Sequence, residues 1–440
     1  YDLAGRPTNA VDSVSLARAY LYNRRNELAE AIVGTNAFAY AYDTIGNRTA
    51  ASANIVTNTY AANNLNQYTA INRTIEQSEQ SNNFSYDNDG NLTQDDRFVY
   101  AYDAENRLVS ARPISPSEGD LAVVNAYDHK HRRIMKRVER FDGDEWGASE
   151  THTFAYDGSN IVLERIAFAD GSARTVEYFW GNDLSSTEQG AGGVGGLLAV
   201  SVDGVYYFPC YEQNGNVMCY VSESGEIAAQ YVYDPYGNVI EQYGTISGRF
   251  AIRFSTKYTD VETGLISYLR RFYRPDHGRW LNRDPIEEEG GENLYVFCAN
   301  NSASRVDVNG CGTWQFGIPS VVGNKPEFTV SYQMDETECR CCKGVQVLRY
   351  VRKFITGGKH GPYTLDGTPD QFESSYPTGY APDDWPEGPG VGLPFADEPY
   401  YRITWHWDFL FKAKCTAGPL KGKILSTQQK YYMAEGHKQG

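Results

Sequence analysis

Apolar and polar residues alternate along much of the first half of the chain. In the stretch "RFVYAYDAENRLVSA", Phe98, Tyr100 and Tyr102 fall on one face of an extended chain, and Val99 and Ala101 fall on the other. A period of two predicts a β-strand with one buried face. Turn-forming residues follow, and the alternation then resumes. The pattern therefore predicts two antiparallel strands joined by a tight turn.

The same strand-and-turn pattern recurs along the chain. Its full form is Tyr-Asp-x-x-Gly followed by Asn or Arg, and the first steps between copies are 21, 20 and 18 residues. This spacing suits one β-hairpin per unit. The copies read "YDLAGR" at Tyr1, "YNRRNEL" at Tyr22, "YDTIGNR" at Tyr42, "YAANNLNQY" at Tyr60, "YDNDGNL" at Tyr86, "YDAENRL" at Tyr102, "YDHKHRR" at Tyr127, "YDGSN" at Tyr156 and "YDPYGNV" at Tyr233.

The residue types of the repeat favour strands and turns. The Asp is followed three residues later by Gly or Asn, which accept a positive φ in a tight turn. Tyrosines stacked from strand to strand would bury their rings while their hydroxyls reach the backbone or water. A Tyr-rich β-sandwich with accidental internal similarity is the alternative.

The repeats weaken between Asp157 and Ile240. The portion "QGAGGVGGLLAV" predicts a loop or bend, and it lacks the Gly-Lys-Ser/Thr ending of a phosphate-binding loop. Hairpin turns are expected at Asp203-Gly204, at Asn214-Gly215 and at Gly225, so the strands should continue to about residue 248.

Composition supports a β-rich protein and limits its partners. Tyr numbers 34 and Gly 42, whereas Met numbers only 4. The formal charge of −16 lies entirely in residues 1–311, because residues 312–440 hold 14 basic and 14 acidic residues. An acidic body disfavours nucleic-acid backbones and anionic membrane surfaces.

Other bulk features bear on compartment. No run of about eighteen apolar residues occurs, so no membrane-spanning helix is expected. The eight cysteines permit an oxidising compartment without requiring one. The chain opens at Tyr1 inside a copy of the motif, from which we expect further shell and delivery regions upstream.

These motifs resemble those of the RHS family. The units resemble its YD repeats, and residues 254–310 resemble its repeat-associated core in "RFSTKYTDVETGLISYLRRFYRPDHGRWLNRDPI" and "GGENLYVFCANNSASRVDVNG". The resemblance implies a mostly β protein with a YD-repeat shell wall over 1–248, a core domain over 249–311 and a variable, small β-rich C-terminal domain over 312–440. It also implies a bacterial protein, secreted or at the cell surface, whose shell encloses its own C-terminal domain, often a toxin.

The resemblance further implies a self-cleavage site. Asp284 and Asp307 match the two Asp residues of the family's aspartyl autoprotease, with Arg283 as the supporting cation. The turn Asp307-Val308-Asn309-Gly310-Cys311 then places the cut between Cys311 and Gly312. Val308 stands where the family carries Pro and Cys311 where it carries Leu, and Glu287 replaces a Gly. These departures put the cleavage itself in question.

The chemistry expected of such a pair is simple. Two carboxylates held close share a proton, so one can activate water while the other protonates the leaving amide. A tethered substrate has a high effective concentration, so a modest catalyst completes its single turnover. Two alternatives stand beside this reading. Asp284 and Asp307 could serve only as turn residues, or the Cys311 thiol could attack its own backbone with His277 as the base.

Residues 312–440 follow a different pattern. "EFTVSYQM" and "YYRITWHWDFLFKAKC" alternate and predict strands, "GVQVLRYVRKF" fits a strand or a short helix, and a long Pro/Gly-rich loop lies between Gly357 and Pro399. His406 and Asp408 share a strand face, which leaves a nuclease or hydrolase open. The remaining acid and imidazole candidates are His360, Asp366, Asp370 and His437.

The cysteines of this region allow two arrangements. A disulfide between Cys415 and the cluster Cys339, Cys341 and Cys342 is favoured over a metal site with His406, because structural zinc sites separate cysteines by about two residues or more. We expect no metal and no cofactor. The sequence thus favours an RHS-type shell that encloses its C-terminal domain and releases it by a cut at Cys311–Gly312. A non-proteolytic adhesion or carbohydrate-binding protein is the alternative.

Overall fold

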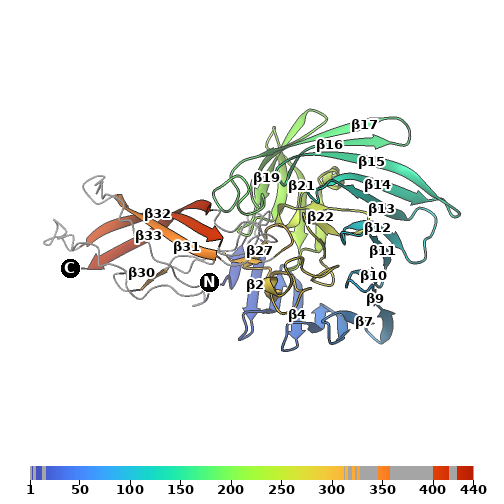
Figure 1. The fold of residues 1–440 in the computed structure, drawn as a ribbon, viewed down its shortest axis with the longest axis horizontal. Helices are drawn as coiled ribbons and strands as arrows, with labels where there is room; N and C mark the ends of the chain where they lie inside the picture. The colour runs from blue at the N-terminus through green and yellow to red at the C-terminus, as the bar shows by residue number, and fades with distance from the viewer. Residues whose placement is uncertain are drawn as a thin grey trace. The chain divides into compact units, whose positions relative to one another are not determined.

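The computed structural model describes residues 2, 6–11, 16–311, 313–315, 320–322, 325–327, 345–356, 400–415 and 424–439. The chain divides into two compact units, Tyr1–Gln315 and Phe316–Gly440. Strands dominate both units (Figure 1), which confirms the expected mostly-β class. None of the helices in the described residues has the length and apolarity that a membrane crossing requires.

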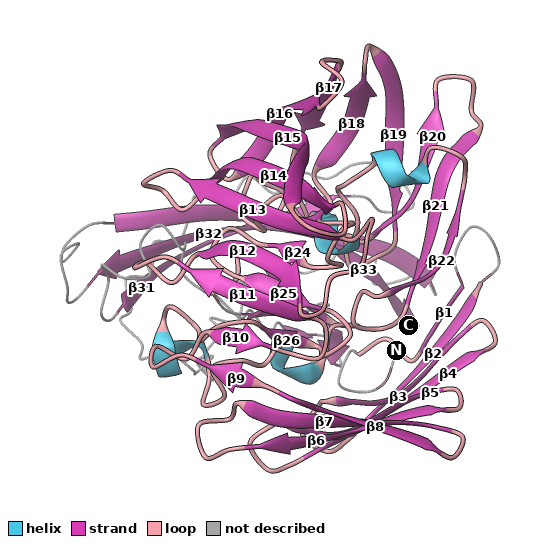
Figure 2. Ribbon diagram, turned by 90° about the vertical axis from the view of Figure 1, so that its right-hand side faces the viewer, coloured by secondary structure: helices cyan, strands magenta, loops and turns pink. Residues whose placement is uncertain are grey.

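The first unit contains two large antiparallel sheets, whose strands β1–β22 we call the wall (Figure 2). Neighbours in sequence are neighbours in each sheet, as hairpin repeats require. The eight-stranded sheet contains β1 (Asn9–Val11), β2 (Ala17–Tyr22), β3 (Leu28–Val33), β4 (Asn36–Tyr42), β5 (Arg48–Ala53), β6 (Val56–Ala62), β7 (Tyr68–Ile75) and β8 (Ser78–Asn83).

The fourteen-stranded sheet continues the same meander through the weakened repeats, as expected. It contains β9 (Ser85–Tyr86), β10 (Leu92–Gln94), β11 (Phe98–Tyr102), β12 (Leu108–Pro113), β13 (Leu121–Tyr127), β14 (Arg133–Phe141), β15 (Trp146–Asp157), β16 (Asn160–Phe168), β17 (Ala173–Trp180), β18 (Leu197–Val202), β19 (Val205–Tyr211), β20 (Val217–Ser222), β21 (Ile227–Tyr233) and β22 (Val239–Tyr243). The "QGAGGVGG" stretch is an irregular loop between β17 and β18.

Residues 249–311, which we call the core segment, fold into short elements rather than long strands. A four-stranded sheet, β23 to β26, stands apart from the wall sheets. The elements are η1 (Ser247–Arg249), η2 (Phe254–Thr256), β23 (Tyr258–Thr259), β24 (Ile266–Ser267), β25 (Phe272–Arg274), β26 (Arg279–Trp280), η3 (Glu287–Gly290), η4 (Cys298–Asn300) and β27 (Arg305–Asp307), which pairs with β28 (Thr313–Gln315).

In most motif turns, the side chain of the residue that opens the turn accepts hydrogen bonds from backbone N–H groups later in the same turn. Asp43 Oδ1 accepts hydrogen bonds from the backbone N–H groups of Ile45 and Asn47, and Gly46 takes φ +87°. The same geometry recurs at six further copies, where a residue with positive φ follows three positions after Asn23, Asn63, Asp87, Asp103, Asp128 and Asp234. The copy at Tyr156 differs, because its hairpin pairs Asp157 with Asn160 and has its positive φ at Gly158. In the fourth copy the turn opens at Asn63 and closes at Gln67, so the motif there aligns on Asn63 rather than on Tyr60.

The motif tyrosines tie one hairpin to the hairpin before it. Tyr42 donates its hydroxyl to Leu28 O at 2.8 Å, and Tyr233 donates to Val217 O at 2.7 Å. The strand register shifts by a β-bulge at these positions, which increases local twist. Bulges lie at Leu21/Tyr22, Ala41/Tyr42, Ala101/Tyr102, Ala126/Tyr127, Ala155/Tyr156, Cys210/Tyr211 and Val232/Tyr233.

The early and late parts of the wall are in contact. Tyr42 and Tyr236, which lie 194 positions apart, share a hydrogen bond of 2.6 Å between their hydroxyls. A single apolar cluster joins Leu28 of β3, Tyr231 of β21 and Phe297 of the core segment. The core segment therefore packs against both sheets.

The core segment also binds the motif turns one after another. In five successive turns, the carbonyl of the positive-φ residue accepts a hydrogen bond from a core side chain. The pairs are Asn301 to Asn26, Asn300 to Gly46, Arg279 to Asn66, Tyr295 to Gly90 and Asn282 to Asn106. The residue with positive φ therefore both shapes each turn and offers its carbonyl oxygen to the core segment.

The second unit contains two small antiparallel sheets. The first pairs β29 (Ser320–Val322) with β30 (Lys325–Glu327). The second contains β31 (Val345–Thr356), β32 (Tyr400–Cys415) and β33 (Ile424–Gln439). The stretch read as strand or helix is therefore a strand. Of the long Pro/Gly-rich loop, residues 358–398 lie outside the described residues, as does most of "EFTVSYQM".

Candidate active site

Asp284 lies in the turn between β26 and η3. Its backbone N–H donates to Leu294 O at 2.9 Å, and its own carbonyl accepts from Glu287 N at 3.0 Å. The Oδ1 atom accepts from Ile286 N at 3.0 Å, across the Pro that fixes the turn. The residue is buried, so Oδ2 faces the interior of the core segment.

Asp307 closes β27 and opens the turn that leads out of the core segment. Its Oδ1 accepts from Gly310 N at 2.6 Å and from Asn309 N at 3.2 Å, and Gly310 takes φ +90°. The expected turn chemistry is therefore present at this Asp. Its side chain is 1% exposed and its Oδ2 faces a cation, an arrangement that a turn alone does not require.

Arg271 joins the two acids. Its Nη2 lies 2.7 Å from Asp284 Oδ2 and 3.9 Å from Asp307 Oδ2, and its side chain is 1% exposed. The guanidinium also stacks over Trp280, with its carbon 4.2 Å from the ring centre. One buried cation thus contacts both carboxylates, which are 23 positions apart in sequence.

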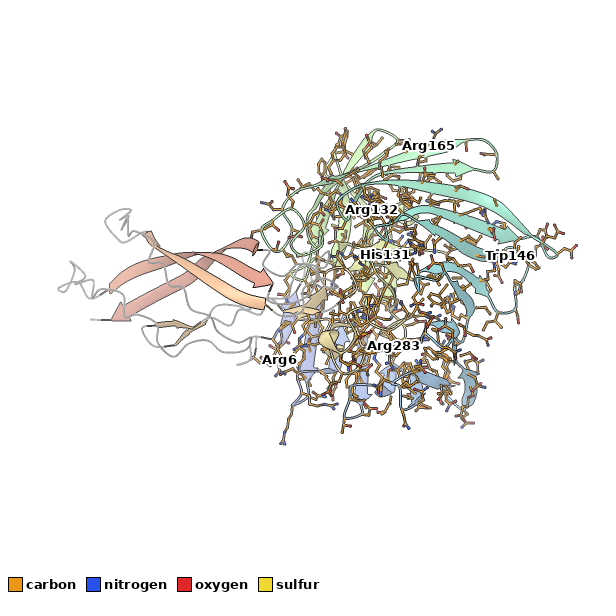
Figure 3. The ribbon with its side chains drawn as sticks, viewed as in Figure 1. Arg6, His131, Arg132, Trp146, Arg165 and Arg283 are labelled. Carbon is orange, nitrogen blue, oxygen red and sulfur yellow. The ribbon has the colours of Figure 1, made fainter. Side chains whose placement is uncertain are left out.

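Arg283, the cation that the family resemblance implied, lies elsewhere. Its side chain is exposed and packs beside Gly90 and the hydroxyl of Tyr295, in the region labelled in Figure 3. Among the described side chains, Arg271 is the arginine in contact with Asp284. Alternation gave no sequence signal for Arg271, because Phe272 and Tyr273, on opposite faces of the strand that follows, are both buried.

Burial and charge set the protonation of this group. Burial raises the pKa of Asp284 above its ordinary value, and the guanidinium of Arg271 offsets only part of that rise. Burial likewise raises the pKa of the Cys298 thiol, and the charge of Asp307 adds to the rise. Asp284 is therefore suited to hold a proton, and Cys298 stays a thiol.

The segment that carries the predicted cut is buried and closely held. Arg271 Nε donates to Gly310 O, and Arg270 N donates to Asn309 O at 2.9 Å. Cys311 is 4% exposed. Gly312 lies outside the described residues. The two acids, the guanidinium and the peptide before the predicted cut thus form one cluster.

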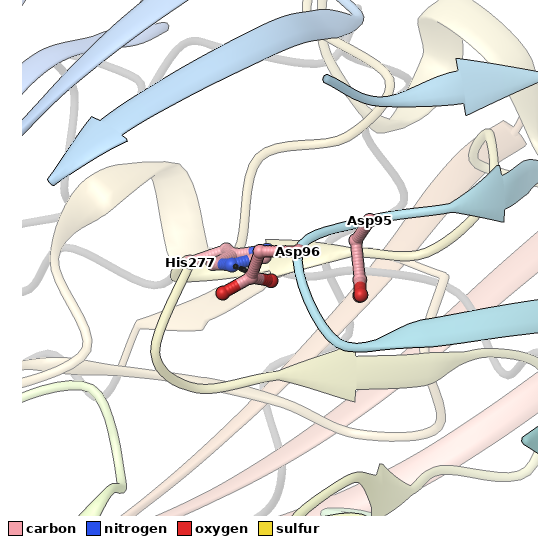
Figure 4. A group of neighbouring side chains, drawn as sticks. All are labelled: Asp95, Asp96 and His277. Atoms are coloured by element: carbon pink, nitrogen blue, oxygen red, sulfur yellow. Dashed lines mark ion pairs between the residues drawn. The ribbon is translucent and has the colours of Figure 1, made fainter. Parts of the chain in front are cut away.

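His277, considered as a base for Cys311, belongs to another cluster. Its Nε2 lies 3.2 Å from Asp96 Oδ1, and Asp95 stands beside them (Figure 4). Two acids and an imidazole could ligate a metal, but Arg274 Nη1 bonds to Asp95 and Arg274 Nη2 lies 3.0 Å from Asp96 Oδ1. The guanidinium supplies the positive charge there, so we assign the cluster to core–wall docking.

The chemical candidates of the second unit are only partly described. His406 and Asp408 lie two positions apart on β32, in register with Phe354 and Arg352 of β31. Of the cysteines, Cys339, Cys341 and Cys342 lie outside the described residues, and so do His360, Asp366 and Asp370. The predicted disulfide with Cys415 and the alternative metal site therefore stay predictions.

Several known proteins resemble this chain over part of its length. It is 28% identical to the tRNA3(Ser)-specific nuclease WapA of Bacillus spizizenii over 303 residues, which are 67% of this chain and 12% of WapA. It is 29% identical to the double-stranded DNA deaminase toxin A of Burkholderia cenocepacia over 234 residues, 49% of this chain and 16% of the toxin. It is 28% identical to the toxin protein Tse5 of Pseudomonas aeruginosa over 255 residues, 52% of this chain and 19% of Tse5.

Among solved structures, a crystal structure of TcdB2-TccC3 matches with a TM-score of 0.49 at 16% identity, covering 69% of this chain and 18% of that chain. The chain thus spans less than a fifth of each of these proteins. The sequence profile described as the Teneurin YD-shell matches residues 5–142 and 192–301, more than half of the chain. The chain therefore belongs to the Teneurin YD-shell family, and the prediction of an RHS-type YD-repeat shell protein is confirmed.

Proposed function

We propose that this protein encloses its own C-terminal domain, residues 312–440, within a YD-repeat shell and frees that domain by cutting itself once. The observation that carries the proposal is the contact of one buried arginine, Arg271, with Asp284, Asp307 and the carbonyl of Gly310. Such a group is costly to bury, and its last residue, Gly310, lies five positions before the end of the first unit at Gln315.

The proposed reaction is hydrolysis of the Cys311–Gly312 peptide bond. Asp307 takes a proton from a water molecule, and the resulting hydroxide adds to the carbonyl carbon of Cys311. Asp284, whose raised pKa lets it hold a proton, gives that proton to the nitrogen of Gly312 as the C–N bond breaks. The products are a carboxylate at Cys311 and a free amine at Gly312.

Arg271 takes the role that the sequence reading gave to Arg283. Its Nη2 orients the carboxyl of Asp284, and its Nε fixes the carbonyl one residue before Cys311. Arg271 Nε binds the carbonyl of Gly310, which belongs to the peptide bond before the proposed cut. Cleavage of that Gly310–Cys311 bond would leave Cys311 on the released fragment, so the mass of the fragment distinguishes the two positions.

The freed domain is proposed to act as a toxin in another cell. Three of the curated relatives carry toxin or nuclease names, which supports this role for the freed domain. Delivery outside the producing bacterium, by secretion or at the cell surface, follows from the same proposal.

Intact mass measured on freshly purified full-length chain tests the proposal. Wild type should give two masses, with a new N-terminus at Gly312, whereas Asp284→Asn and Asp307→Asn should each give one uncut mass. Asp170→Asn, in an exposed wall turn, is the matched control and should cut as wild type does. A wild-type chain that stays uncut on long incubation would favour the adhesion or carbohydrate-binding alternative.

A further inference from the structure

Lys257 carries a buried positive charge between η2 and β23. The residue is 8% exposed. Its Nζ donates to the carbonyl of Val308 at 2.6 Å and to the carbonyl of Gly192 at 2.6 Å. An ammonium in such a place loses most of its hydration, so its hydrogen bonds to backbone carbonyls are short and charge-assisted.

The contact with Val308 completes a row. Three successive carbonyls before the predicted cut each accept a hydrogen bond from the core segment: Val308 from Lys257 Nζ, Asn309 from Arg270 N and Gly310 from Arg271 Nε. Three fixed carbonyls in a row leave the chain little freedom to rotate before Cys311. These contacts fix the chain as far as Gly310, one residue before the proposed cut.

The wall contributes to this row through its Gly-rich loop. Gly192 takes φ +61°, and a Cβ atom there would lie 2.2 Å from Val308 O. The loop is held from the other side, because Gly195 N donates to Thr256 Oγ1 at 2.7 Å. The loop's glycines therefore allow wall backbone to approach the carbonyl that Lys257 binds.

We propose that Lys257 is a positioning residue for self-cleavage, which holds the departing segment against the acids by binding the carbonyl of Val308 and anchoring it to the wall at Gly192. The inference rests on the proposed function. The ammonium of Lys257 binds main-chain carbonyls of the departing segment and of the wall, so its proposed effect is on where the substrate lies. Small errors in the position of a reacting bond cost large factors in rate.

A cleft gives small molecules a route to this ammonium. Lys257 lines it together with Tyr268, Trp180 and Asn309. Shortening the side chain to alanine would open space at the end of this cleft. A free alkylammonium ion can then enter and replace the missing charge, which gives a test that does not depend on a further mutation.

The experiment follows cleavage of the full chain over time during cell-free synthesis, on gels and by mass. Lys257→Met should slow cleavage at least tenfold and Lys257→Arg should restore part of the rate, while the exposed control Lys130→Met should match wild type. Lys257→Ala should be slow alone and faster with propylammonium, whereas equal propanol or sodium chloride should have no effect. Thermal unfolding checks that each variant is folded.

Two results would overturn the inference while the proposed function stands. One is a Lys257→Met chain that cuts at the wild-type rate. The other is a Lys257→Ala chain that propylammonium does not accelerate, because a purely structural loss gives no response to the added ion. Failure of wild type to cut at all would instead overturn the proposed function, and the inference with it.

Discussion

Arg271 donates its Nε to the main-chain carbonyl of Gly310, which lies 39 residues further along the chain. The same guanidinium binds Asp284 through Nη2, and Nη1 donates to Leu294 O at 3.1 Å. Every nitrogen of this side chain therefore has a partner, and the partners include an acid and the segment that leads to the second unit. Because one guanidinium makes all of these contacts, substitution of Arg271 alone tests the proposed mechanism.

Replacing Arg271 by Gln should abolish self-cleavage. Loss of the cation would deprive the buried carboxyl of Asp284 of a hydrogen-bond donor, which in proteins costs about 1–3 kcal/mol of folding free energy. Arg283→Gln removes the same charge from an exposed site and should cut normally with little change in stability. Intact mass and denaturant unfolding of both variants make the comparison, and equal cleavage by both would contradict our assignment of Arg271.

Self-cleavage should slow as the pH rises. The pKa of Asp284 is raised by burial, so its proton is bound more tightly in the folded state than in the unfolded chain. The corresponding stability is full below the unfolded pKa, about 3.9, and is lost as the pH rises through the higher folded pKa. The cleavage rate and the contribution of Asp284 to the unfolding free energy, measured against an Asp284→Asn variant, should both fall in that direction. A rate that increases steadily over this range would argue against Asp284 as the acid.

Gly192→Ala tests whether the close approach of the wall backbone to the carbonyl of Val308 contributes to self-cleavage. The added methyl would meet Val308 O at 2.2 Å, and the backbone at φ +61° disfavours any residue with a side chain. The expected result is slower cleavage together with a loss of stability. Gly171→Ala, in a wall turn at φ +86° with open space around it, carries the backbone strain alone. If both variants slow cleavage equally, the close approach to Val308 has no role.

Tyr233→Phe should destabilise the wall by about 1–2 kcal/mol. The hydroxyl of Tyr233 is buried and donates to Val217 O at 2.7 Å, so its removal deprives a buried carbonyl of a donor. Tyr243→Phe is the control, because the exposed hydroxyl of Tyr243 donates to the side chain of Glu241 and not to a buried carbonyl. Urea unfolding of the two variants gives the comparison. Equal midpoints would mean that the motif hydroxyls add nothing to wall stability.

Protonation of His152 should stabilise the wall at lower pH. Burial alone would lower the pKa of His152, but its contacts with Glu150 and Glu164 raise it above the ordinary value despite the opposing charge of Lys136. Stability from this charge is full below about pH 6.5 and is lost as the pH rises through the raised folded pKa. Melting curves of wild type and His152→Gln should converge at high pH. Curves that differ by the same amount at every pH would exclude the charge as the cause.

Local chemistry made the wall predictable. The Asp-x-x-Gly turn and the alternation around Tyr100 and Tyr102 act over a few residues, and the structure reproduces both. The copy placed at Tyr60 begins two residues too early. Asn63 takes the place of the Asp that opens the turn, and Ala62 takes the place of the tyrosine before it. A motif search keyed on Tyr follows the wrong residue there.

The site was harder to predict because its contacts are long-range. Asp284 and Asp307 were identified through family motifs, but no local pattern indicates that Arg271 rather than Arg283 turns inward toward them. The contact of Lys257 with Val308 spans 51 residues and depends on how the wall loop at Gly192 approaches. Such pairings follow from the assembled fold and not from the neighbouring sequence.

The binding of five turn carbonyls by the core segment has a consequence for timing. Asn301, Asn300, Arg279, Tyr295 and Asn282 reach these carbonyls only once the corresponding hairpins are built. The same short segment carries Asp284, so the acids reach their working positions last. If the protein releases its C-terminal domain as proposed, release would wait for completion of the wall, which would protect the producing cell without any external signal.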